Sequence, residues 1–102
     1  SPRYTALMSG ESDVIDAFLT DGLLKKFGLT VLEDDKNFFP PYYAIPVVRG
    51  EILEKYPEIQ DVFEKLAPLL TDESMQEMNY QIDELQKDEK DVAAAFLEKN
   101  GF

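Results

Sequence analysis

The chain has 102 residues, of which 44% are hydrophobic and 12% aromatic, so its composition predicts one domain with a buried core. Its 21 acidic and 10 basic residues give a formal net charge of -11, which argues against nucleic acid as a partner, because that affinity depends on cations that neutralise phosphates. The absence of cysteine and histidine excludes disulfides, thiol catalysis, zinc fingers and histidine acid–base chemistry.

The first residues predict a short helix followed by a strand. Tyr4, Leu7 and Met8 recur at helical spacing, and Gly10 suits the left-handed position that commonly ends a helix. Residues 14–18 are mostly apolar on both sides of the pleat, as in strands of parallel sheets that are covered on two faces. We therefore expect a buried strand here.

A second helix and strand follow. Thr20 is a suitable N-cap for a helix that runs through Phe27 and stops at Gly28. Residues 30–32 belong to a short β-branched run that favours a strand. The first half of the chain thus predicts the order helix, strand, helix, strand.

The segment 36–49 is rich in proline and aromatic residues, so its backbone is expected to be extended and stiff rather than helical. Within it, 42–48 is predicted as a strand, and Pro46 places that strand at an edge or an irregular position.

The second half predicts helices only. Their expected ranges are 52–56, 57–66, 72–85 after a cap at Thr71, and a last helix between an Asp88 cap and Gly101. The whole pattern therefore predicts an α/β chain with a few-stranded sheet, about five helices and a helical C-terminal half.

Two segments are candidates for a binding site, and each has a structural alternative. The aromatic and proline run Phe38–Tyr43 holds rings on a stiff backbone, which suits a binding wall for a cation, although aromatic rings also serve as ordinary core packing. The segment Phe18–Gly22 joins a predicted strand to a helix, where ligands collect in parallel α/β folds, although it also fits an ordinary capped turn.

Metal binding and catalysis are poorly supported. Residues 33–37 resemble half of a calcium loop but lack its turn glycine and its distant bidentate glutamate, so a solvated turn is the better interpretation. The acidic residues at helical spacing are typical of solvated faces, and no nucleophile or phosphate loop accompanies them. We expect no catalytic residue, no metal site and no cofactor.

Several strings of residues together resemble one family. They are DVIDAF (13–18), TDG (20–22), LEDDK (32–36), FFPPY (38–42), PVVR (46–49) and TDESMQEMNY (71–80). This order is similar to the carboxyl-terminal part of the substrate-binding proteins of osmoprotectant ABC importers, which capture glycine betaine, carnitine, choline and related quaternary amines. The resemblance covers nearly the whole chain.

The resemblance implies part of a periplasmic-binding-protein type 2 fold, in which two α/β lobes close on a ligand. Residues 1–41 would form the end of the second lobe and the return crossing, and 42–102 the carboxyl-terminal part of the first lobe. The family holds its trimethylammonium ligand in an aromatic cage. By the matching motifs, Phe18 and Tyr42 would be two of its rings, with cation–π attraction as the mechanism.

The resemblance further implies an extracytoplasmic protein, associated with the membrane through its parent and partnered by a permease. The family's domain is more than twice as long as this chain, so we expect the remaining rings upstream, weak ligand binding by these residues alone, and self-association of strands with too few neighbours. The alternative is a stand-alone acidic α/β protein-interaction module, and an enzyme ranks third.

Overall fold

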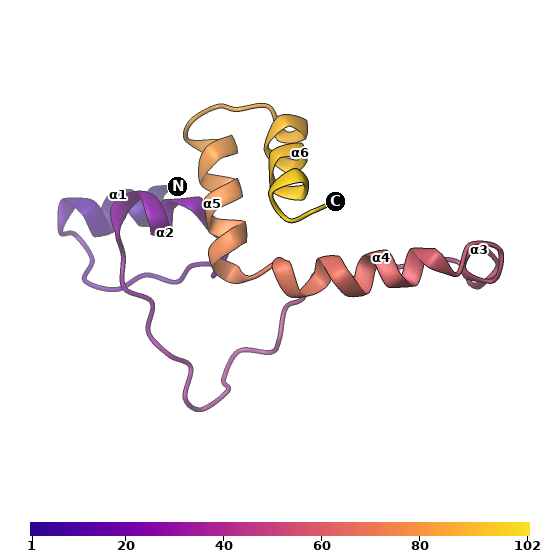
Figure 1. Ribbon diagram of the computed structural model, residues 1–102. Coiled ribbons are helices and arrows are strands. Elements are labelled where there is room, and N and C mark those ends of the chain that lie inside the picture. The colour runs from indigo at the N-terminus through magenta and orange to yellow at the C-terminus, as the bar shows by residue number, and fades with distance from the viewer. The chain divides into compact units, whose positions relative to one another are not determined.

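The computed structural model describes residues 1–102 and contains six α-helices and one short 3-10 helix (Figure 1). The helices are α1 (Pro2–Ser9), α2 (Gly22–Phe27), α3 (Gly50–Lys55), α4 (Glu58–Leu66), η1 (Ala67–Leu69), α5 (Asp72–Asp83) and α6 (Glu89–Lys99). They form two compact units. Unit 1 consists of Ser1–Thr30 and Asp72–Phe102, and unit 2 consists of Val31–Thr71.

Most helix ends fall where the sequence predicts them. Gly10 and Gly28 follow α1 and α2 with φ values of 77° and 58°, a left-handed conformation that glycine adopts without a steric penalty. Asp88 caps α6, because its side chain accepts hydrogen bonds from the backbone N–H groups of Lys90 and Asp91.

The predicted cap of α2 is wrong by one residue. Asp21, and not Thr20, occupies the N-cap position, and its side chain makes no capping hydrogen bond with the helix. The capping bond is missing because the Asp21 carboxylate accepts a hydrogen bond from the hydroxyl of Tyr4 on α1 instead.

The predicted strands are absent from the structure. Residues 14–18, 30–32 and 42–48 have no regular secondary structure, so the expected few-stranded sheet is not formed by these 102 residues. A strand depends on a neighbour that accepts and donates its ladder hydrogen bonds, and none of these segments pairs with another. High β-propensity alone therefore did not produce a strand.

The buried core is smaller than the composition predicts. Only Tyr4, Leu24 and Val92 are buried hydrophobic side chains, and all three belong to unit 1. Apolar residues of the unpaired segments stay exposed, among them Leu32 and Val47. The buried core is thus limited to three hydrophobic side chains, because no sheet covers the apolar residues of the unpaired segments.

Helix α2 lies in close contact with α5 inside unit 1. A Cβ atom added to Gly22 would lie 2.6 Å from the backbone nitrogen of Tyr80 and 2.8 Å from its Cα atom. Only glycine permits this approach of two backbones. Ion pairs from Lys25 to Glu77 and from Lys26 to Glu84 join the same two helices.

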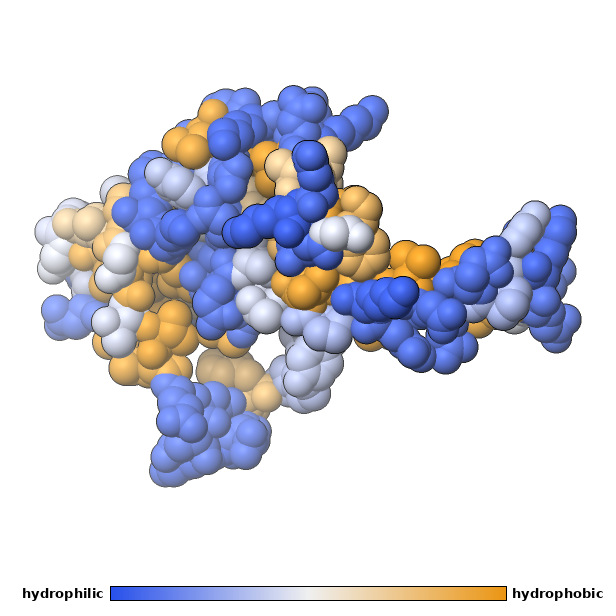
Figure 2. All heavy atoms as spheres, in the orientation of Figure 1, coloured by the Kyte–Doolittle hydropathy of each residue, from blue (hydrophilic) through white to orange (hydrophobic).

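Unit 2 contains α3, α4 and η1. The apolar residues of α4 recur at helical spacing and include Val62 and Phe63, both of which are exposed. Figure 2 shows hydrophobic and hydrophilic atoms gathered on different sides of this part of the chain. Helix α4 is therefore amphipathic, as its sequence predicts.

The compact units do not follow the predicted division of the chain at residue 41. Helices α5 and α6 group with the first thirty residues, and the segment 31–71 forms a unit of its own. The assignment of 1–41 and 42–102 to two lobes concerns the fold of a complete binding domain, and it stays a prediction.

We expect Gly22→Ala to lower the free energy of unfolding by about 1–3 kcal/mol, because the added methyl group meets backbone atoms of α5 that cannot move cheaply. Gly50→Ala is the matched control, since a Cβ atom there meets nothing within 4 Å and alanine favours the helix. Urea denaturation followed by circular dichroism measures both. A Gly22→Ala variant as stable as Gly50→Ala would contradict the close contact.

Candidate functional site

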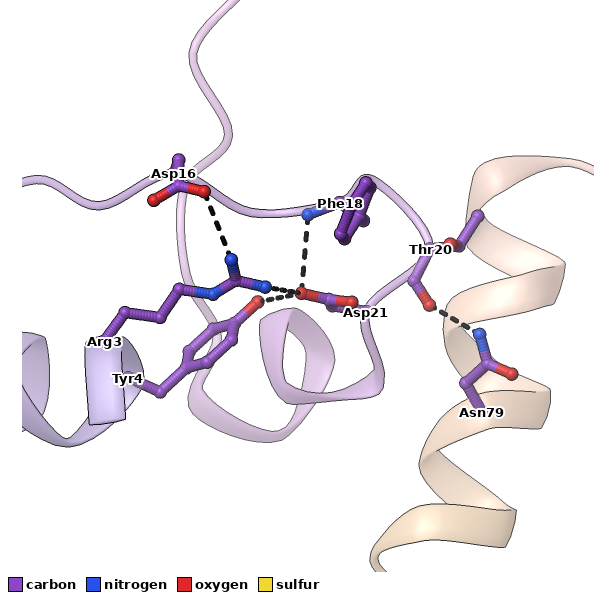
Figure 3. Close-up of polar contacts among 7 residues, drawn as sticks. All are labelled: Arg3, Tyr4, Asp16, Phe18, Thr20, Asp21 and Asn79. Carbon is purple, nitrogen blue, oxygen red and sulfur yellow. Dashed lines mark hydrogen bonds and ion pairs between the residues drawn. The ribbon is translucent and has the colours of Figure 1, made fainter. Parts of the chain in front are cut away.

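The loop that carries Phe18 is fixed on one side by α5. The side-chain amide of Asn79 donates a 2.7 Å hydrogen bond to the carbonyl oxygen of Thr20, as Figure 3 shows. The side-chain amide of Gln76, one turn earlier on the same helix, donates to the carbonyl oxygen of Leu19. These bonds satisfy two backbone carbonyls that the loop has no ladder or helix to satisfy.

On its other side, the loop is fixed through the Asp21 carboxylate. Oδ2 of Asp21 accepts a 2.7 Å hydrogen bond from the Tyr4 hydroxyl and lies 3.4 Å from Nη2 of Arg3 (Figure 3). It also accepts a 3.4 Å hydrogen bond from the backbone N–H of Phe18. The backbone N–H of Asp21 donates in return to the Phe18 carbonyl oxygen at 3.0 Å, which closes a turn over residues 18–21.

Tyr4 is the rigid member of this network. Its side chain is only 3% exposed, and its ring centroid lies 6.5 Å from that of Phe27 on α2. Burial, together with the hydrogen bond to the Asp21 carboxylate, raises the pKa of Tyr4 to about 12. The phenol therefore stays protonated throughout the neutral range and remains a hydrogen-bond donor to the Asp21 carboxylate.

The Phe18 ring is exposed and has a cation above it. The side chain is 56% exposed, and Cζ of the Arg3 guanidinium lies 5.9 Å from the ring centroid. The guanidinium is held there by a 3.1 Å ion pair with Asp16 and by the longer one with Asp21. This contact shows that the Phe18 ring meets a positive charge at cation–π distance.

Tyr42 belongs to unit 2 and is 89% exposed. It follows a turn in which both carboxylate oxygens of Asp34 accept 2.9 Å hydrogen bonds, from the backbone N–H groups of Phe38 and Phe39. These two hydrogen bonds lower the pKa of Asp34, and the bond from Phe38 has the larger effect. The two Phe rings pack edge to face, with centroids 5.1 Å apart. The acidic segment 33–37 thus forms the turn that the sequence predicts.

The two predicted site residues lie in different compact units, Phe18 in unit 1 and Tyr42 in unit 2. Sequence reasoning missed the groups that fix the Phe18 loop, namely Arg3, Tyr4, Gln76 and Asn79. The spacing of Gln76 and Asn79, three residues apart on one helix face, is a signal that could have indicated a shared role. Tyr4 carried no such signal, because its position also fits an apolar helix stripe.

The chain matches one family over nearly its whole length. Residues 2–99 match the family described as the substrate binding domain of the ABC-type glycine betaine transport system. The chain therefore belongs to this family, which serves transport and not catalysis, and whose fold is of the periplasmic-binding-protein type 2.

Three relatives agree with this assignment. An ergothioneine transport permease/ergothioneine binding protein, EgtU, of Helicobacter pylori is 46% identical over 99 residues, which are 97% of this chain and 18% of that protein. The carnitine transport binding protein OpuCC of Listeria monocytogenes is 41% identical over 97% of this chain and 32% of its own length. A glycine-betaine-binding protein of Pseudomonas aeruginosa is 41% identical over 95% of this chain and 31% of its own.

The chain thus spans about a third or less of the length of these relatives. None of its helices is long and apolar enough to cross a membrane.

We expect the contribution of the Tyr4 hydroxyl proton to stability to be lost between about pH 10 and pH 12. The folded chain holds the phenolic proton more tightly than the unfolded chain, so this stability is complete below the ordinary pKa and is lost as the pH rises through the folded value.

The measurement is the unfolding free energy of the wild type minus that of Tyr4→Phe, from urea titrations at several alkaline pH values. The variant removes only this hydroxyl, so the subtraction cancels the titration of the lysines. A difference that stays constant from pH 9 to pH 12 would be incompatible with the raised pKa.

Proposed function

We propose that these residues are part of the solute-binding component of an ABC importer for quaternary ammonium solutes such as glycine betaine, carnitine or choline. The observation that carries this proposal is the exposed Phe18 ring, with a cation at 5.9 Å, in a chain that matches the glycine betaine family over residues 2–99. The solutes named for the relatives, glycine betaine, carnitine and ergothioneine, share a trimethylammonium group and a carboxylate.

Aromatic rings suit such a ligand for a chemical reason. A trimethylammonium group has no N–H to donate, so hydrogen-bond acceptors cannot recognise it specifically, whereas the negative face of a π-system attracts it. In the proposed site Phe18 and Tyr42 are two walls of an aromatic cage. The cation–π attraction amounts to about 2 kcal/mol or more when the cation is desolvated.

In the proposed site, this chain alone does not remove the ligand cation from water. Phe18 and Tyr42 are both exposed, and two exposed rings leave most of the cation in water, where each contributes about 0.5–1 kcal/mol. We infer that further rings and the groups for the ligand carboxylate come from other parts of a complete binding domain. Its segments would also supply strand partners for 14–18, 30–32 and 42–48, giving the α/β sheet and the two lobes.

The proposed partners follow from this role. The complete protein would deliver its solute to a permease on the outer face of the cell membrane or in the periplasm. The net charge of -11 is compatible with a cationic head group and unfavourable for nucleic acid.

A stand-alone acidic interaction module is the second candidate. It is favoured by the exposed apolar side chains of unit 2, which include Ile45 and Val47. It would need no quaternary ammonium ligand, and the same binding experiment separates the two functions.

Calorimetry with glycine betaine, carnitine and choline tests the proposal. We expect the 102-residue chain to bind none of them at micromolar concentration, and the full-length protein that contains it to bind at least one. In that protein Phe18→Ala should lower the affinity about thirtyfold, which corresponds to a loss of about 2 kcal/mol.

Tyr42→Ala should have a similar effect in the same protein. Tyr56→Ala, which removes an exposed ring of α3's C-terminal end, is the control and should leave the affinity unchanged. Micromolar binding by the 102-residue chain would refute the incomplete site. A full-length protein that binds no quaternary amine would refute the function.

The unpaired segments predict self-association of the isolated chain at high concentration, because exposed apolar residues on a backbone without a strand partner favour pairing with a second copy. Sedimentation velocity over a range of concentrations measures this. A single sharp monomer boundary at all concentrations would contradict it.

A further inference from the structure

The Asp21 carboxylate connects a buried hydroxyl to the backbone of the candidate ligand-binding ring. One oxygen, Oδ2, accepts from the Tyr4 hydroxyl and from the Phe18 backbone N–H, as Figure 3 shows. Among the side chains that contact Asp21 or Phe18 in this network, Tyr4 is more deeply buried than Arg3, and Asp16 at the far end of the Arg3 ion pair is largely exposed.

We propose that Tyr4 is a positioning residue for ligand binding, whose hydroxyl acts through Asp21 to fix the Phe18 backbone and so the direction in which the Phe18 ring meets a cation. The inference rests on the proposed function. Beyond the proposed cage rings, the inference assigns a role to Tyr4, which does not touch the ligand and acts on the site through its hydrogen bond to Asp21.

The geometry assigns this role to Tyr4 more than to Arg3. The Tyr4–Asp21 bond is 2.7 Å, a short charge-assisted hydrogen bond, whereas the Arg3–Asp21 contact is 3.4 Å. Tyr4 is buried and its ring packs on Phe27, so its hydroxyl has one fixed place. Arg3 divides its guanidinium between Asp21 and the largely exposed Asp16.

A ring on a fixed backbone binds better than one on a mobile loop. The Phe18 side chain is 56% exposed, and hydrogen bonds order the turn over residues 18–21. A ligand that must first order this turn loses the corresponding part of its binding free energy. The Tyr4 hydroxyl removes that cost before the ligand arrives.

Amide hydrogen exchange on the 102-residue chain, measured by NMR, tests the positioning directly. In Tyr4→Phe we expect exchange of the Phe18 amide to accelerate roughly tenfold or more, since a hydrogen bond to a charged group is lost from the turn. The control is Asp88→Ala, which removes the α6 cap within the same unit and lowers stability without touching the loop.

If Tyr4 only contributes stability, Tyr4→Phe and Asp88→Ala will change exchange at Phe18 in proportion to their losses of unfolding free energy. That result would overturn the proposal. Selective acceleration at Phe18 in Tyr4→Phe supports it.

A second pair of variants tests the link through Asp21. Asp21→Asn keeps an oxygen that accepts from Tyr4 and from the Phe18 N–H, so exchange at Phe18 should stay near the wild-type rate. Asp21→Ala removes the acceptor and should accelerate exchange as Tyr4→Phe does. Equal rates in the two Asp21 variants would contradict the assigned route.

Glycine betaine affinity of the full-length protein provides the functional readout. We expect Tyr4→Phe to weaken binding about tenfold while Asp88→Ala leaves it unchanged. Unchanged affinity in Tyr4→Phe, with a wild type that binds, overturns the inference alone. A wild type that binds no quaternary amine overturns the proposed function, and the exchange data then still decide whether Tyr4 orders the Phe18 turn.

Discussion

The approach of Gly22 to the backbone of Tyr80 is the constraint on which unit 1 depends. It brings α2 against α5 closely enough for side chains of α5 to reach the loop that precedes α2. With any larger residue at this position, the amide of Asn79 would be farther from the Thr20 carbonyl oxygen. A sequence-distant helix thereby orders a loop that has no regular structure of its own.

The same loop illustrates how an exposed ring can be held in place without a core. Helices α1 and α2 each contribute one buried hydrophobic side chain, Tyr4 and Leu24, and the Tyr4 ring lies beside that of Phe27 on α2. Hydrogen bonds then determine the loop, through Asp21 on one side and Asn79 on the other. The Phe18 side chain stays 56% exposed in this arrangement, with the Arg3 guanidinium over its ring.

Local features of the fold could be predicted from the sequence and the non-local ones could not. Helix ends at Gly10, Gly28 and Asp88 depend on the conformation or hydrogen bonding of a few neighbouring residues, and the structure confirms them. Strands depend on partners far along the chain, so a β-branched run such as 30–32 does not establish one. Asp21, the N-cap residue of α2, makes no capping hydrogen bond because its carboxylate accepts from the hydroxyl of Tyr4, seventeen residues away.

The candidate site divides in the same way. Phe18 and Tyr42 could be proposed from the sequence because each belongs to a short motif that resembles the family. The residues that support Phe18 come from α1 and α5, which only the tertiary structure brings to the loop. The matched residues cover only 18% to 32% of these three relatives, so patterns in this chain describe only part of each of them.

The most direct test of this account is a nuclear Overhauser effect between the α hydrogens of Gly22 and the backbone amide hydrogen of Tyr80 in the isotope-labelled 102-residue chain. The contact of α2 with α5 predicts a strong cross-peak between them. Its absence, with both resonances assigned and both helices formed, would contradict the contact that orders the Phe18 loop.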